Sequence, residues 1–584
     1  MRTAISLLGV LAALLLAGAC FDPTRTCSTD ADCVNGGTCD PGTKTCVAAG
    51  NPNDKNPPVF SIVVTGPSPR PDTAKLTGYD PGAPDGGHDA FRRDESVQVT
   101  VTSHDQDVSA GSVKLLAHGI AASAGTALDV PLAPCGSANP AASNPFCREG
   151  TVPLASLPFE AFRAVVPLEV SGTDLSNNMG TADAGLNVTR WKWRYSAGAP
   201  IYTTPAIADD GTIVFGTSDG GSGSVYALAD DGAERWTPTA VGPIKASPVL
   251  GDSDGGQQFG YVATAASAGK LLAVDLSNGS IVIACPSGAS GYGGPILGSP
   301  AFTIGSSSFE GALALVNGER LVNIRPGPPI PEDRCLSASV TSSQNYPSSV
   351  VAAGPGAYVG TIDGTVRAFT LLSGNWVTNT DWGGGVGYAP VGNAPVQLAL
   401  VSSSIVGTTS LRGVFALDDR TGALQGNYPD GGVQADPGSP VITQSDYLFG
   451  SGITPSPLLY SVSPTFSTGS ANSMSDPLIG APLVGQGGLA YLATVGGTLE
   501  CRADATTVRW SGSFGAGESF LGSPTIGCGA FGGPLGVLYV GSVSGSFYAI
   551  VVDSPGLEST APWPKYQHDV RNTGNPTTPI QSCP

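Results

Sequence analysis

A short phrase recurs eight times between residues 203 and 526, and its spacing constrains the fold more than any other feature of this 584-residue chain. In seven copies a small residue precedes a proline, and apolar residues usually follow it, as in Ala246-Ser247-Pro248-Val249-Leu250. In the fourth copy, Pro347-Ser348-Ser349-Val350-Val351, we align Ser349 with the prolines. The steps between aligned positions are 43, 52, 49, 46, 45, 42 and 42 residues. The other seven aligned positions are Pro205, Pro248, Pro300, Pro395, Pro440, Pro482 and Pro524.

A period in this range is typical of the four-stranded blades of a β-propeller. Each copy contains short apolar strands separated by Gly and Asp turns, which is an all-β pattern. Small residues suit a first strand that lies at the crowded central axis, and proline suits an edge without a ladder partner. Eight copies therefore predict an eight-bladed propeller over residues 188–555. The alternating segment Val188–Tyr195 is expected to complete the last blade and close the ring.

The hairpin ends of several copies resemble the pyrroloquinoline-quinone-like (PQQ-like) propeller repeat. The resemblance rests on the segments Tyr226–Trp236, Ala273–Gly279 and Phe415–Gly422, and on the tail phrase Pro562–Gly574. It covers roughly residues 190–575. Quinone-dependent dehydrogenases resemble this propeller, which implies a cofactor held by an adjacent cysteine pair or by basic residues, with a calcium site and an Asp base.

This chain departs from that enzyme pattern. It has no adjacent cysteines, and copies seven and eight carry only Arg502 and Arg509 before the tail. A cofactor with several carboxylates needs cationic partners. None of the four histidines lies inside the repeats, and no nucleophile-elbow phrase is present. We therefore expect no enzymatic activity, no catalytic residue and no cofactor, and we interpret His568-Asp569 as structural parts of a docking tail, residues 556–584.

The N-terminus has the form of an export signal. One basic residue, Arg2, precedes the apolar run Ala4–Leu16, which is too short to span a membrane. Residues 1–19 then form the signal peptide, and the small residues before Cys20 resemble a bacterial lipoprotein signal. The resemblance implies a lipidated Cys20 as membrane anchor, with Phe21 favouring the outer membrane. Plain secretion after Ala17-Gly18-Ala19 is the alternative.

The cysteines agree with an oxidising compartment. Residues 20–47 resemble small Cys-rich, EGF-like modules, and two disulfides among Cys27, Cys33, Cys39 and Cys46 would staple them in one of three connectivities. A zinc site is the alternative, but the segment has neither histidine nor a Cys-x-x-Cys pair. Further expected pairs are Cys135 with Cys147, Cys285 with Cys335, and Cys501 with Cys528, which leaves Cys583 over.

Residues 48–58 form a linker, and residues 59–187 are expected to form a β-sandwich, because their apolar segments alternate with period two. The phrase Val170–Asn178 resembles the end of bacterial immunoglobulin-like (Ig-like) domains. Such a domain usually acts as a spacer or a binding module. We assign no metal here, with calcium as the alternative. Its ligands would be Asp105, Asp107, Asp174 and Asn178.

A net charge of −19 without basic clusters argues against nucleic-acid binding. We interpret the chain as a non-enzymatic, lipid-anchored envelope protein whose propeller binds a protein partner or a surface polymer. In this it resembles the propeller lipoprotein of the outer-membrane barrel-assembly machinery, a scaffold that lacks the Cys-rich and sandwich modules. The alternative is a carbohydrate-binding module that uses Trp376, Trp382 or Trp510 as exposed platforms.

Overall fold

The structure is a computed structural model, and the statements below concern the part of the chain that it describes. The described residues are 27–28, 38–39, 44, 46–47, 54–121, 127–252, 257–287, 291–303, 311–316, 320–324, 335–339, 348–361, 364–372, 375–382, 396–401, 403–409, 413–428, 438–451, 457–528 and 533–581. The predicted signal peptide and Cys20, Cys33 and Cys583 lie outside them. In the Cys-rich segment, β1 (Thr38–Cys39) pairs antiparallel with β2 (Cys46–Val47).

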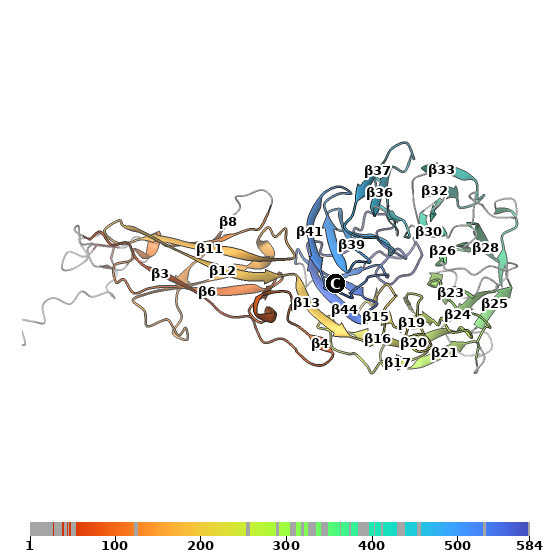
Figure 1. The fold of residues 1–584 in the computed structure, drawn as a ribbon, viewed down its shortest axis with the longest axis horizontal. Coiled ribbons are helices and arrows are strands. Elements are labelled where there is room, and N and C mark those ends of the chain that lie inside the picture. Colours follow the sequence, from red (N-terminus) through yellow and green to blue (C-terminus); the bar gives the residue numbers. More distant parts are fainter. Residues whose placement is uncertain are drawn as a thin grey trace, which may run out of the picture. The chain divides into compact units, whose positions relative to one another are not determined.

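The chain divides into two compact units, residues 1–68 with 83–189 and residues 69–82 with 190–584. Besides the β1–β2 pair, the first contains two larger sheets, drawn in orange and yellow in Figure 1. One sheet has the order β3 (Phe60–Val64), β6 (Ser96–Ser103), β10 (Phe146–Pro153), β9 (Ala133–Pro134). The other has the order β5 (Phe91–Arg92), β12 (Met179–Thr189), β11 (Arg163–Thr173), β7 (Lys114–His118), β8 (Ala127–Val130). Two short 3-10 helices, η4 (Ala110–Ser112) and η5 (Leu154–Ser156), lie in the connections between these sheets, and a third, η3 (Pro84–Gly87), precedes β5.

Both sheets of this unit contribute to one apolar core. Val99 and Val101 of β6 are buried, as are Leu168 and Val170 of β11. The side chains between them point to the other face, because successive residues of a strand alternate. The period-two pattern in the sequence therefore corresponds to a two-layered β-sandwich.

The second unit is built from successive sheets, and the described residues form eight of them. We call each sheet a blade and its first strand the inner strand. Seven blades have four strands in chain order. Blade 1 consists of β14 (Ala206–Ile207), β15 (Ile213–Gly216), β16 (Ser224–Leu228) and β17 (Thr239–Ala240), and blade 2 consists of β18 (Val249–Asp252), β19 (Gln258–Ala263), β20 (Leu271–Asp275) and β21 (Ile281–Cys285). Blade 3 consists of β22 (Ala301–Thr303), β23 (Gly311–Val316), β24 (Arg320–Ile324) and β25 (Cys335–Ser339), and blade 4 consists of β26 (Val351–Ala353), β27 (Gly356–Gly360), β28 (Val366–Leu372) and β29 (Asn375–Thr378). Blade 5 consists of β30 (Val396–Val401), β31 (Ser404–Thr409), β32 (Gly413–Asp418) and β33 (Leu424–Tyr428). Blade 6 consists of β34 (Val441–Ile442), β35 (Tyr447–Gly450), β36 (Leu458–Val462) and β37 (Gly469–Ser473). Blade 7 consists of β38 (Leu483–Gly485), β39 (Leu489–Ala493), β40 (Thr498–Arg502) and β41 (Val508–Ser513).

Blade 8 joins the two ends of this unit. It combines β42 (Thr525–Gly527), β43 (Gly536–Gly541) and β44 (Ser546–Val552) with β13 (Trp191–Ser196), which precedes blade 1 and pairs antiparallel with β44. The closing strand was expected over Val188–Tyr195, but Val188 and Thr189 belong to β12 of the sandwich. A fifth strand, β4 (Leu76–Thr77), pairs with β13. Residues 69–82 therefore belong to the propeller unit, and their assignment to the sandwich was wrong.

A chain of hydrogen bonds at the small residues joins neighbouring inner strands. The amide of Thr204 donates to Ser247 Oγ at 2.9 Å, and the amide of Ser247 donates to Ser299 Oγ at 2.7 Å. The amide of Ala481 in blade 7 donates to Ser523 Oγ of blade 8 at 2.7 Å, and the amide of Ser523 donates to Thr204 Oγ1 at 3.0 Å, which joins blade 8 to blade 1. Successive sheets, the last of which is completed by a strand that precedes the first, have the arrangement of a β-propeller (Figure 1).

The same bonds correct the alignment of the fourth copy. The amide of Ser299 donates to Ser349 Oγ at 3.1 Å, so Ser349 occupies the place of Ser299, which precedes a proline. Val350, and not Ser349, therefore stands in the proline position. The fourth copy has no proline at this position, so the sequence alone could not show which of its residues aligns with the prolines of the other copies.

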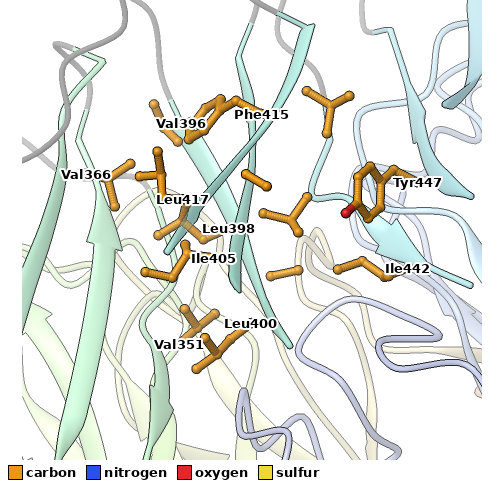
Figure 2. Packing of buried hydrophobic residues seen from close by; sticks show 14 of the residues in the cluster. Val351, Val366, Val396, Leu398, Leu400, Ile405, Phe415, Leu417, Ile442 and Tyr447 are labelled. Carbon is orange, nitrogen blue, oxygen red and sulfur yellow. The ribbon is translucent and has the colours of Figure 1, made fainter. Parts of the chain in front are cut away.

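Neighbouring blades pack face to face through apolar side chains. One core cluster combines residues of blades 4, 5 and 6 with Trp563 of the C-terminal segment. Figure 2 shows side chains of blade 5, among them Leu398, between Val366 of blade 4 and Tyr447 of blade 6. Both faces of strands inside the blades, such as β15, β20 and β43, are covered, so these strands read as continuous apolar runs rather than as alternating ones.

Candidate functional site

The inner strands leave one edge without a ladder partner, and the C-terminal segment occupies it. We call residues 556–581 the tail. In six blades the amide two residues after the proline position donates to a tail carbonyl. The six pairs, given as amide and carbonyl, are Ile207 and Val570, Leu250 and Arg571, Phe302 and Thr573, Ala352 and Gly574, Ile442 and Trp563, and Val484 and Pro564, at 2.7–2.9 Å. The tail thereby connects blades 1 to 4, 6 and 7 by backbone bonds that do not depend on side-chain identity.

Lys565 organises the turn at the centre of the tail. Its side chain is fully buried, and Nζ donates to the carbonyls of Tyr566 and Asp569 at 2.8 and 3.0 Å and also to Asn572 Oδ1. Asn572 Nδ2 donates in turn to the carbonyl of Thr204 at 3.1 Å. Burial lowers the pKa of Lys565 to about 7, against the attraction of Asp569.

Asp569 forms the second buried centre of the tail. It accepts hydrogen bonds from the amide of Arg571 at 2.9 Å and from the hydroxyls of Thr573 and Thr578, and His568 Nδ1 lies 3.1 Å from Oδ2. Burial would raise the pKa of Asp569, but the bonds from His568, Thr573 and Thr578 outweigh it and lower the pKa. A carboxylate with this many internal donors is suited to holding a segment in place.

Tyr566 reaches the small residues whose hydrogen bonds join the inner strands. Its hydroxyl donates to Ser299 Oγ at 2.7 Å and forms a further hydrogen bond with Ser349 Oγ. The tail is thus tied both to the edges of the inner strands and to the hydroxyls that link them. The docking tail was predicted from the resemblance of Pro562–Gly574 to a phrase of PQQ-like propellers, but the backbone bonds could not be predicted, because they leave no mark on the sequence.

The three tryptophans predicted as exposed platforms are buried, so that prediction was wrong. Trp376, Trp382 and Trp510 have exposed fractions of 5%, 1% and 3%. Trp382 Nε1 donates to the carbonyl of Asp419 in blade 5 at 3.1 Å, and Trp510 Nε1 donates to Asp553 Oδ2 of blade 8 at 2.9 Å. Trp376 packs in the core cluster between blades 3 and 4.

A tryptophan of blade 1 shows why these rings are buried. Trp236 Nε1 donates to the carbonyl of Leu276 in blade 2 at 3.0 Å. The ring lies so close to Gly279 that a Cβ there would approach it to 2.5 Å, and Gly279 also has a φ of 75°. The glycine of one turn thus leaves room for the tryptophan of the preceding blade. The position of Trp236, four residues after the turn glycine Gly232, was the signal for an internal role of this ring.

Arg190 stabilises the junction where the ring closes. It is fully buried, its guanidinium lies 4.4 Å from the centre of the Trp510 ring, and it forms an ion pair of 2.9 Å with Asp553. A planar guanidinium can stack on an indole and bind a carboxylate at the same time. Blades 7 and 8 and the segment leading into β13 therefore meet at one polar cluster.

Three disulfides agree with pairs that the sequence offered. Cys135 bonds to Cys147 and Cys285 to Cys335, each with a Cα–Cα distance of 5.5 Å. Cys27 bonds to Cys39, which excludes the connectivities that pair Cys27 with Cys33 or Cys46. The side chains of those two residues lie outside the described part of the chain.

The pairing of Cys501 with Cys528 was wrong. Cys501 is a free, buried thiol whose pKa burial raises to about 12, and Cys528 takes part in a different disulfide. Cys501 lies on the third strand of blade 7, whereas Cys528 follows the inner strand of blade 8. Cys285 and Cys335 can bond because both lie on outermost strands. Adjacent blades are therefore not sufficient, and the two cysteines must also occupy similar positions along the blade.

An acidic cluster in the sandwich unit contains two of the four predicted calcium ligands, Asp107 and Asp174. Carboxylate oxygens of Asp54, Asp107 and Asp174 lie within 4.8 Å of one another. Burial and the charges of the neighbouring aspartates raise the pKa of Asp107. Asp105 instead accepts from the amide of Val59 at 2.7 Å, and Asn178 Nδ2 donates to Asp174 at 2.8 Å. Asp54 was missed because it lies in the predicted linker.

No helix among the described residues has the length and apolar character needed to cross a membrane. No protein-family model matches the chain, and no curated protein matches it. Among solved structures, the chain is similar to the computationally designed Ika8 protein, with 13% identity, a TM-score of 0.43 and coverage of 61% of this chain and 98% of that one. It is also similar to BamB from Moraxella catarrhalis, with 13% identity, a TM-score of 0.41 and coverage of 60% and 93%.

Proposed function

We propose that the chain is a non-enzymatic scaffold of the cell envelope, anchored by a lipid on Cys20. An EGF-like segment and an Ig-like sandwich precede an eight-bladed PQQ-like propeller, which binds a protein partner through its turns. The proposal includes no catalytic residue and no cofactor. The observation that carries it is the way in which the tail ties six blades into one frame.

Blades that the tail holds in fixed positions favour a binding role for a physical reason. Binding costs less when the surface is already ordered, because loops and side chains lose little freedom on association. Hydrogen bonds among the inner strands, buried tryptophans between blades and the Cys285–Cys335 disulfide all support such order. The disulfides also support export, since they persist in oxidising compartments.

The carbohydrate alternative loses its predicted platforms, because Trp376, Trp382 and Trp510 are buried. The dehydrogenase alternative is tested separately by an oxidation assay with added quinone and calcium. Turnover in that assay would contradict the non-enzymatic proposal.

The scaffold proposal is tested by crosslinking on intact cells, followed by mass spectrometry. We expect the wild-type chain to capture one defined envelope protein in stoichiometric amounts. A Cys20→Ser variant, which lacks the acylated thiol, is the control for anchoring and is expected to leave the membrane fraction. Absence of any specific protein crosslink with the wild-type chain would refute the scaffold role, and membrane retention of the variant would refute the anchor.

A further inference from the structure

A cleft opens between blades 6 and 7, with the tail as its third wall, and encloses about 440 Å³. Blade 6 contributes the turn between β34 and β35, blade 7 contributes the turn after β40, and the tail contributes Glu558, Thr560 and Ala561. Clefts of a few hundred cubic ångströms are the usual size of binding sites in proteins. All its walls belong to the propeller unit.

Each wall of the cleft carries one carboxylate. Asp446 comes from blade 6, Asp504 from blade 7 and Glu558 from the tail. None of the three forms an ion pair with a basic group among the residues that the structure describes, and the cleft lining there contains neither lysine nor arginine. The three negative charges thus face one volume without a cation to balance them.

Internal donors hold these carboxylates in place. Asp446 accepts from Ser445 Oγ at 2.6 Å, and Asp504 accepts from the amide of Thr506 at 2.7 Å. Glu558 accepts from the amide of Gly487 at 3.1 Å and from Thr560 Oγ1 at 2.7 Å, so it bridges the tail and blade 7. Hydrogen bonds from its turn lower the pKa of Asp504 to about 2, which keeps it ionised at neutral pH.

The floor between the carboxylates is apolar. It includes Leu448, Leu459 and Val484, which are buried beneath the opening. Lysine and arginine side chains fit an apolar floor flanked by carboxylates, because their alkyl stems cover apolar surface while their cationic ends bind the carboxylates. A floor of this kind does not suit a bare metal ion, which needs oxygen ligands on all sides.

From the cleft, its floor and its three uncompensated carboxylates, we propose that this site binds a lysine- or arginine-bearing extended segment of a protein partner. The inference rests on the proposed scaffold function and specifies the chemistry of the partner. The complementary charge is what selects this occupant over an acidic or neutral segment.

The test measures binding of a fluorescent peptide of alternating lysine and alanine to the full mature chain by anisotropy. Asp446→Asn and Asp504→Asn are each expected to weaken binding about threefold and together about tenfold, as exposed ion pairs do. Acetylation of the peptide lysines should abolish binding, and added salt should weaken it. Equal binding by the double variant would overturn the proposal.

Asp231→Asn is the matched control. Asp231 lies in the corresponding turn of blade 1 and accepts from the amide of Ala233 at 2.9 Å, but it is remote from the cleft. Its removal should leave peptide binding unchanged. A loss of binding equal to that of the cleft variants would show that only the net charge of the chain matters. Should Asp504→Asn disturb its turn, Asp446→Asn still tests the cleft. Spermidine binding as tightly as the peptide would overturn the assignment to a protein segment.

Crosslinking on cells separates the two proposals. A partner captured by the wild-type chain but lost with the double variant supports both. A partner captured equally by both chains leaves the scaffold role standing and overturns the cleft. No partner with the wild-type chain refutes the scaffold role, even where the peptide binds.

Discussion

Two carboxylates in this molecule, the buried Asp569 and the partly buried Asp107, have opposite surroundings. Asp569 in the tail is enclosed by hydroxyl, amide and imidazole groups, and its pKa is lowered. Asp107 in the sandwich faces two further carboxylates, and its pKa is raised. Burial opposes ionisation in both, so the neighbours decide the direction. A carboxylate surrounded by donors holds structure together, whereas one surrounded by like charges costs stability until a cation or proton arrives.

The largest effect is expected from removing the satisfied carboxylate. Asp569→Ala leaves the hydroxyls of Thr573 and Thr578 and the ring of His568 without their shared acceptor. We expect a loss of about 3–5 kcal/mol in the free energy of unfolding, as for other broken buried networks. Denaturant unfolding followed by tryptophan fluorescence measures it. A loss below about 1 kcal/mol would show that the backbone bonds hold the tail without Asp569.

A buried charge that is only partly compensated should show itself through pH. The folded pKa of Lys565, about 7, lies below its ordinary value of 10.5. Between these values the unfolded chain binds more protons, so stability rises with pH, by at most about 1.4 kcal/mol per pH unit. Lys565→Met should remove this rise between about pH 7 and pH 9. Melting temperatures of both chains across that range test it, and parallel profiles would contradict it.

The carboxylate of Asp107, which neighbouring carboxylates repel, should make stability depend on pH in the opposite sense to Lys565 and less strongly. Its raised folded pKa means that the folded chain holds its proton more tightly, so stability falls as pH rises from the ordinary value of 3.8 through the raised one. Asp107→Asn should therefore stabilise the sandwich at neutral pH, by roughly 0.5 kcal/mol after screening. The gain should disappear in acid. Thermal unfolding with a calcium chelator measures it.

The calcium alternative makes the same variant more informative. With millimolar calcium in place of the chelator, an ion bound by Asp54, Asp107 and Asp174 would raise the melting temperature of the wild-type chain only. The variant would then be the less stable of the two. An unchanged order in both buffers leaves the cluster as an uncompensated group of surface acids.

The smallest effect concerns a group that remains neutral. Burial raises the pKa of the Cys501 thiol to about 12, so almost no thiolate exists at neutral pH. We expect no alkylation of Cys501 by iodoacetamide in the native chain and complete alkylation in denaturant, as measured by peptide mass spectrometry. Rapid native alkylation would mean that blades 7 and 8 separate readily.

The sequence predicted what depends on periodic residue types. Small residues and prolines located the inner strands, and alternation located the strands of the sandwich. Where a copy lacked its proline, as at Val350, the register slipped by one residue. Long-range pairing carried no such signal: β4 joins blade 8 through two residues far from the repeats, and the tail binds through its backbone.

The candidate sites were less predictable because their chemistry depends on which neighbours meet. The aspartates of the sandwich turn were found, but Asp54 comes from the predicted linker and could be placed only by the fold. The tryptophans were interpreted as platforms because aromatic residues can serve either surface or core. Their contacts with the next turn, as between Trp236 and Gly279, decide for the core.

The tail also sets an order on biosynthesis. Asn572 binds the carbonyl of Thr204 across 368 residues of sequence, and blade 1 receives its edge partner from Val570. The ribosome makes these inner strands long before the segment that covers them, so the tail must be synthesised and in place before the first blade is complete. Contacts so distant in sequence slow folding. A prematurely terminated product would expose uncovered strand edges, the surface that chaperones and proteases recognise in unfinished chains.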